Sequence, residues 1–175
     1  MSATGFNLFF DASKSENSRL SHDSNQPNPR IRMLKNIPPL LSPDLMYVLM
    51  KMGHGDDIVL ADGNFPADSH AQRLIRLDGH GVPEILEAIL QFFPLDTFVE
   101  QPAGVMNPVD DQTPTPPIWK TYADLIQQHD SRKTGLEKIE RFEFYDRARN
   151  AYAIIATSES ALYANLILKK GVVTT

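Results

Sequence analysis

The chain has 175 residues, of which 42% are apolar, and a formal net charge of −5 at pH 7. This suits one globular domain and argues against nucleic acids or anionic membranes as partners, because either would need a basic face. The chain contains no cysteine, which excludes disulfides and thiolate chemistry and is compatible with the cytoplasm, and no apolar run approaches the roughly 20 residues that span a bilayer.

Residues 1–32 differ in composition from the rest of the chain. They are rich in Ser, Asn and Pro and have no sustained hydrophobic periodicity. The apolar cluster at residues 6–10 is too short for a secretory signal core, and no basic region precedes it. We therefore predict a disordered N-terminal extension over residues 1–32 and a globular domain over residues 33–175.

Beyond this extension, the pattern alternates between helices and strands. Ser42 is a good N-cap and Pro43 suits the first helical position, so the apolar repeat that follows predicts a helix over residues 43–52. Gly53 is expected to end this helix in a left-handed conformation. A buried strand is expected over residues 57–61.

The remaining elements continue the alternation. In chain order we predict a strand at 74–77, a helix at 82–93, an extended piece at 97–99, helices at 119–128 and 142–150, and strands at 151–157 and 165–169. Residues 100–118 contain five prolines and are predicted to form a long loop, which inside a domain is usually functional or part of an interface. This order of elements predicts an α/β fold with helices layered around a central sheet.

The most informative motif is Gly53-His54-Gly55-Asp56, followed by Asp62 at the end of the predicted strand. The two glycines let the backbone come close to a bound molecule. A histidine and a carboxylate at the ends of neighbouring elements are the ingredients of general acid–base chemistry. The same residues also have an ordinary structural interpretation, in which His54 caps a turn and Asp62 binds backbone amides. Spacing alone does not decide between these two interpretations.

Six longer segments carry a family resemblance. They are MLK at 33–35, SPDL at 42–45, MGHGD at 52–56, DGNFP at 62–66, RFEFYDRA at 141–148 and YANLILKKGV at 163–172. In this order they resemble the fucose mutarotase family, which belongs to the sugar mutarotase superfamily shared with ribose pyranase. The resemblance covers about residues 33–173, and the segments at 115–119 and 139–145 are closer to the animal-type members.

The resemblance implies an isomerase that interconverts the α and β anomers of its small-molecule substrate, L-fucose, with activity on ribose in some members. It implies one domain with a three-layer α/β/α fold and a mixed central sheet. It also implies a homo-oligomer, which in many members is a decameric ring with sites between subunits. Ring opening and closing by general acid–base chemistry requires no covalent nucleophile, metal or nicotinamide.

Carried over residue by residue, the resemblance implies His54 as the proton donor and several further site positions. These are the substrate-contacting positions Asp62, Arg141, Tyr163 and Asn165, with Asp96 and Tyr145 matching the animal-type members. Mutarotation delivers a proton to the ring oxygen and removes one from the anomeric hydroxyl. A histidine, with an ordinary pKa near 6.5, gives and takes protons at neutral pH. Tyr163 or Tyr145 would then relay the proton of the anomeric hydroxyl.

Two other classes of function remain open. A metal-dependent hydrolase or isomerase would use His54, Asp62 and His70, although their spacing matches no compact metal motif. A non-catalytic monosaccharide-binding or regulatory protein would keep the pocket without accelerating anomer exchange. Because the candidate residues at 54, 62, 141 and 163–165 come from the ends of elements, we expect them at one edge of the sheet. An interface with a second subunit should lie beside them, with the loop at 100–118 as a candidate contact.

Overall fold

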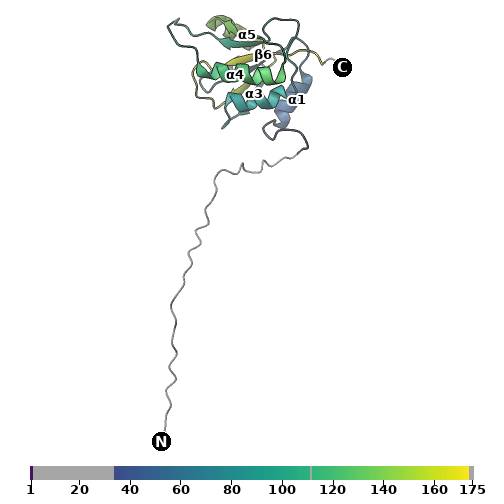
Figure 1. Ribbon diagram of the computed structural model, residues 1–175, viewed down its shortest axis with the longest axis vertical. Helices are drawn as coiled ribbons and strands as arrows, with labels where there is room; N and C mark the ends of the chain where they lie inside the picture. Colours follow the sequence, from purple (N-terminus) through teal and green to yellow (C-terminus); the bar gives the residue numbers. More distant parts are fainter. Residues whose placement is uncertain (2–33, 111, 174–175) are drawn as a thin grey trace. The chain divides into compact units, whose positions relative to one another are not determined.

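Within the residues that the structure describes, 34–110 and 112–173 together with Met1, this computed structural model has a six-stranded sheet in the order β2-β5-β1-β6-β3-β4. Figure 1 shows the course of the chain through its helices and strands. Its strands are β1 (Asp57–Ala61), β2 (Leu74–Leu77), β3 (Ala103–Met106), β4 (Glu137–Ile139), β5 (Ala153–Thr157) and β6 (Leu166–Lys169). β6 pairs antiparallel with β1 and β3, whereas the other pairs are parallel. The carboxyl ends of the parallel strands and the amino end of β6 therefore meet at one edge, which we call the carboxyl edge.

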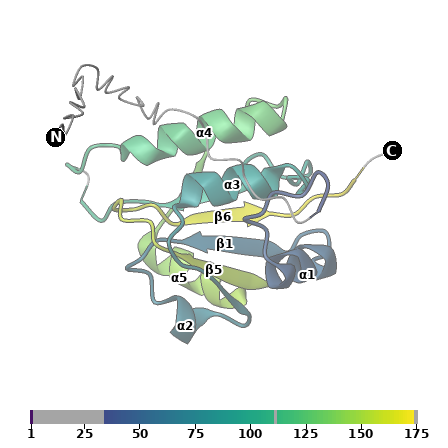
Figure 2. The ribbon, with the colours of Figure 1, turned by 90° about the horizontal axis from the view of Figure 1, so that it is seen from below.

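Helices cover both faces of this sheet (Figure 2). The helices are α1 (Pro43–Lys51), α2 (Ala67–His70), α3 (Val82–Leu90), α4 (Pro117–His129) and α5 (Arg141–Asn150). Residues of α1, α3 and α4 share a core with Ile58 and Leu60 of β1. Residues of α2 and α5 share the second core with Val59 and Ala61, because successive side chains of a strand point to opposite faces. The predicted three-layer α/β/α fold with a mixed sheet is confirmed.

The end of α1 differs from the prediction. The hydroxyl of Ser42 caps the amino end, as expected. The helix then leaves through Met52 in an extended conformation, with φ −64° and ψ 137°, and the left-handed glycine is Gly55, with φ 85°. The left-handed cap predicted at Gly53 is therefore wrong. The N–H of Gly53 instead donates to Oδ2 of Asp56 at 2.7 Å, which stabilises the extended exit.

The extended piece predicted at residues 97–99 is also wrong. The carboxylate of Asp96 accepts a hydrogen bond from the N–H of Phe98 at 3.0 Å, and this local turn competes with a strand. The strand forms later, as β3, inside the segment predicted as a loop. The helix predicted at 82–93 ends at Leu90. The other predicted elements are confirmed to within about two residues, the usual uncertainty of an element's ends.

The predicted disordered extension, residues 1–32, lies outside the described residues apart from Met1. All the helices and strands above lie within one unit, residues 31–175. None of the described helices has both the length and the apolar character needed to cross a membrane.

Candidate functional site

A cavity of about 280 Å³ lies at the carboxyl edge of the sheet. It is lined by Asp62, Asn64, Phe65, Met106, Val109, Arg141, Tyr145, Leu162, Tyr163 and Asn165. Open α/β sheets bind ligands outside the carboxyl ends of their strands. The volume is just below the range that is usual for ligand pockets, roughly 300–1,000 Å³. Five of the seven residues predicted for the site meet here, and the position and size of the cavity suit a small polar ligand.

Asp62 and Asn165 form the buried polar floor of this cavity. Asp62 follows β1 and Asn165 precedes β6, and these two strands are neighbours. The N–H of Asp62 donates to Oδ1 of Asn165 at 2.9 Å, and Nδ2 of Asn165 donates to Oδ2 of Asp62 at 2.8 Å. The N–H of Asn64 donates to Oδ1 of Asp62 at 2.9 Å. The two side chains are therefore held in fixed orientations before any ligand binds.

Burial raises the pKa of Asp62 above its ordinary value of 3.8, although hydrogen bonds from the backbone of Asn64, Phe65 and Ala164 and from Asn165 counter part of this rise. A carboxyl group whose pKa is raised by folding binds more protons in the folded protein than in the unfolded chain. It therefore favours the folded state at low pH, and this contribution is lost as the pH rises through the folded pKa.

Asp62→Asn removes this titration. We expect the free energy of unfolding of the variant, relative to wild type, to increase as the pH rises from about 3.8 to neutral, because only the wild type must ionise a buried carboxyl. Urea unfolding of both proteins across this pH range measures the difference. A difference in the free energy of unfolding that stays constant with pH would contradict a raised pKa for Asp62.

Arg141 and Tyr145 enter the cavity wall from the first two turns of α5. The carboxylate of Glu140 caps this helix by accepting from two backbone N–H groups. The guanidinium of Arg141 lies 5.8 Å from the ring centroid of Tyr145. That ring also packs against Phe65 at 5.5 Å and against His70 at 5.4 Å. The side of the cavity formed by α5 is thus cationic and aromatic.

His54 and Asp96 do not reach the cavity. His54 precedes β1 and Asp62 follows it, so the two residues lie at opposite edges of the sheet. A five-residue strand spans about 16 Å. The expectation of one shared edge is therefore wrong for His54, and Asp96 lies beside it.

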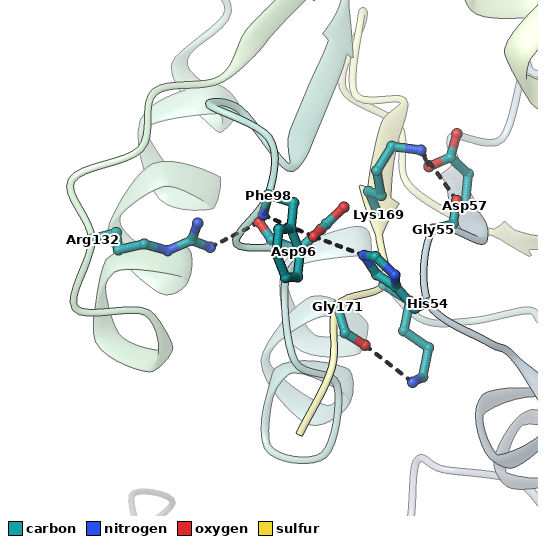
Figure 3. A network of polar contacts seen from close by, with 9 residues as sticks. His54, Gly55, Asp57, Asp96, Phe98, Arg132, Lys169 and Gly171 are labelled. Carbon is teal, nitrogen blue, oxygen red and sulfur yellow. Dashed lines mark hydrogen bonds and ion pairs between the residues drawn. The ribbon is translucent and has the colours of Figure 1, made fainter. Parts of the chain in front are cut away.

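At this opposite edge, His54 contacts Asp96 (Figure 3). Nε2 of His54 lies 3.2 Å from Oδ1 of Asp96, and the imidazole lies 5.3 Å from the ring of Phe98, between centroids. Burial alone would raise the pKa of Asp96. Hydrogen bonds from the N–H of Phe98 and from His54 outweigh it, so the pKa lies below 3.8. An ionised carboxylate only accepts hydrogen bonds, so Nε2 of His54 carries the hydrogen and Nδ1 is left for another partner.

The loop that carries His54 is fixed by β6 and the residue after it (Figure 3). Nζ of Lys169 donates to the carbonyl of Gly55 at 3.2 Å and to Oδ1 of Asp57 at 2.8 Å. The N–H of Gly55 donates to the carbonyl of Lys170 at 2.8 Å. β6 therefore has a candidate residue at its amino end, Asn165, and the anchor of the His54 loop at its carboxyl end.

Apolar side chains are exposed beside both groups of residues. Phe98, next to His54, is 76% exposed, and Val109 and Leu162, which line the cavity, are 68% and 70% exposed. Exposed apolar groups near a polar site are typical of surfaces that contact other proteins. The histidine side chain itself is 46% exposed. Within a single chain, solvent therefore reaches both His54 and the mouth of the cavity.

The metal-dependent alternative has no converging ligands. Over the described part of the chain, no group of three or more His, Cys, Asp or Glu residues is arranged to hold a metal ion. His54 and Asp62, two of the three ligands considered for it, lie at opposite edges of the sheet.

A larger hollow of about 360 Å³, between the end of α3 and the segment after β6, includes none of the predicted site residues.

The chain is similar to proteins of known name along almost all of its described length. The model of the RbsD / FucU transport protein family matches residues 35–173. The chain is 54% identical to the fucose mutarotase of Mus musculus over 144 residues, 79% of this chain and 94% of the mouse protein. It is 46% identical to the L-fucose mutarotase of Actinobacillus pleuropneumoniae over 140 residues, 80% of this chain and 97% of that protein. The crystal structure of the fucose mutarotase from Streptococcus pneumoniae in complex with L-fucose matches with a TM-score of 0.77 and 50% identity, over 81% of this chain and 100% of that chain.

Proposed function

The chain belongs to the RbsD / FucU transport protein family, and we propose that it is a mutarotase that interconverts the α and β anomers of L-fucose. The observation that carries this proposal is the cavity at the carboxyl edge, with its fixed Asp62–Asn165 floor, in a fold that matches a fucose-bound mutarotase. We place the activity in the cytoplasm, in keeping with a chain that contains no cysteine.

In the proposed reaction, the bond between C1 and the ring oxygen O5 breaks. Protonated His54 gives a proton to O5, while Tyr163 or Tyr145 relays the proton that leaves the anomeric hydroxyl. The resulting aldehyde turns about the C1–C2 bond, and the same steps in reverse close the ring on the other face. Asp62 and Asn165 orient the sugar hydroxyls, and Arg141 binds a sugar oxygen. Asp96 fixes the imidazole so that Nδ1 meets the substrate.

His54 must come from a second copy of the chain. Within one chain, β1 separates it from the cavity, so the acid and the sugar cannot meet. A contact in which the His54 edge of one copy covers the cavity of the next is head-to-tail, and such contacts form a ring when the rotation closes. We therefore propose a homo-oligomeric ring, with ten subunits as in many members of the family. Exposed Phe98 on one copy, and Val109 and Leu162 on the next, are the candidate contacts.

Exchange NMR of the anomeric protons tests the proposed activity. L-fucose with catalytic amounts of the protein should exchange α and β signals faster than in the same buffer without protein, by the roughly 10²–10⁴-fold typical of a positioned acid or base. D-ribose and D-galactose under the same conditions report the sugar preference. Saturation-transfer contacts to L-fucose without faster exchange would instead favour the non-catalytic sugar-binding alternative. The absence of both binding and exchange would overturn both proposals.

A further inference from the structure

Two buried aromatic side chains of α4 bind the turn that leads into β6. Trp119 is 5% exposed and Tyr122 is fully buried, and their spacing of three residues puts them on the same face of the helix. Nε1 of Trp119 donates to the carbonyl of Tyr163 at 2.8 Å. The hydroxyl of Tyr122 donates to the carbonyl of Ala164 at 2.8 Å. Two consecutive backbone carbonyls before β6 thus accept hydrogen bonds from side chains that lie about one helical turn apart on α4.

This turn is conformationally unusual. Tyr163 has a φ of 55°, in the left-handed region that residues other than glycine rarely adopt. Tyr163 and Asn165, two residues later, both line the cavity. Such a conformation persists only when its surroundings hold it in place. The two hydrogen bonds from α4 act directly on the backbone of this segment.

We propose that Trp119 and Tyr122 are positioning residues, which hold the left-handed turn so that Tyr163 and Asn165 enter the cavity in the geometry that the sugar needs. Neither lines the cavity, so they act through the backbone of the turn. This inference rests on the proposed function. It gives α4, which carries none of the residues predicted for the site, a part in the reaction.

The environment of Tyr122 keeps its hydroxyl a hydrogen-bond donor. Burial raises the pKa of this phenol well above its ordinary value, and the nearby carboxylates of Glu159 and Asp62 raise it further. The hydroxyl therefore stays protonated at every pH at which the protein is studied. The bond to Ala164 is a constant constraint rather than a switch.

Tyr122→Phe tests the proposal, because it keeps the ring and removes only the hydroxyl. The matched control is Ile126→Val, one turn further along α4, which loses a buried methylene without touching the turn. We expect Tyr122→Phe to lower kcat for L-fucose exchange by roughly 10- to 100-fold and to raise KM, since small displacements of site residues have effects of this size. Ile126→Val, compared at a matched margin below its melting temperature, should keep both constants. A mere loss of folded protein would lower apparent kcat and leave KM unchanged.

A second readout does not depend on catalysis. Tyr122→Phe should increase amide hydrogen exchange at residues 163–165, and Ile126→Val should not. Trp119 is the only tryptophan of the chain, so its emission should respond to L-fucose in wild type and respond less in Tyr122→Phe. If wild type exchanges anomers and Tyr122→Phe matches Ile126→Val in kcat, KM and hydrogen exchange, positioning is overturned. If wild type does not exchange anomers, the proposed function fails, and amide hydrogen exchange at residues 163–165 still decides whether α4 holds the turn.

Discussion

His54→Gln should lower anomer exchange by about 10²–10⁴-fold, the usual contribution of a positioned acid or base. Glutamine keeps a donor for the carboxylate of Asp96 but cannot be protonated. The thermal unfolding midpoint should stay close to that of wild type, because the side chain is 46% exposed and lies outside both cores. Anomeric exchange NMR and calorimetry measure the two effects. His129→Gln, at the exposed end of α4, is the matched control and should exchange like wild type.

Mixing two variants that are each impaired at a different part of the proposed site separates a shared site from a site within one chain. His54→Gln lacks the acid, and Asp62→Asn has an altered cavity floor. When equal amounts are dissociated and reassembled together, about one quarter of head-to-tail contacts should combine an intact His54 with an intact cavity. Exchange should therefore return in the mixture to about that fraction of the wild-type rate. Mixed oligomers, verified by native mass spectrometry, that remain inactive would show that His54 does not act across the interface.

Asn165→Asp should lower the free energy of unfolding by about 3–5 kcal/mol at neutral pH, the size of effect seen when a buried charge is left without a partner. In the wild type, Nδ2 of Asn165 donates to the carboxylate of Asp62 at 2.8 Å. A second carboxylate there would leave two buried anions in contact without a proton between them. Like charges raise the pKa of such a pair, so stability should return as the pH falls and one proton becomes shared.

Urea unfolding between about pH 5 and pH 8 checks the prediction for Asn165→Asp, because a raised carboxyl pKa moves the titration of the pair into that range. Asn165→Ser is the control, since it loses the amide donor without adding a charge. Its loss of stability should change with pH less than that of Asn165→Asp, because it raises the pKa of Asp62 only by removing one hydrogen-bond donor. Equal losses in the two variants at every pH would show that Asp62 and residue 165 do not interact as ionisable neighbours.

Much of the fold could be predicted from the sequence where an element buries a strong apolar face. α1, α3, β1 and β5 are of this kind. β3 and β4 could not be predicted, because the sequence AGVM contains a single β-branched residue and the sequence EKI is short and charged. β3 depends on pairing with β4 and β6, and β4 on pairing with β3, in each case across a long separation in the chain. The mixed α/β/α fold came from the family resemblance and is confirmed, and the mutarotase activity that we propose came from the same resemblance.

The cavity floor could be anticipated only through the resemblance. Asp62 and Asn165 are 103 residues apart, and nothing in local pattern shows that β1 and β6 are neighbours. The separation of His54 from Asp62, by contrast, was already present in the sequence. A residue just before a buried strand and a residue just after it lie at its two ends, whatever the fold. The expectation of one shared edge overlooked this.

Because the cavity and His54 lie at opposite edges of the sheet, a subunit that leaves the proposed ring should behave differently from one within it. Such a subunit should keep the Asp62–Asn165 floor and bind monosaccharide, but its own His54 lies too far from the sugar to donate a proton to it. Dilution should therefore turn a catalyst into a sugar carrier without unfolding it. In the proposed ring, turnover per subunit should therefore rise with protein concentration, because more subunits then have a neighbour that supplies His54.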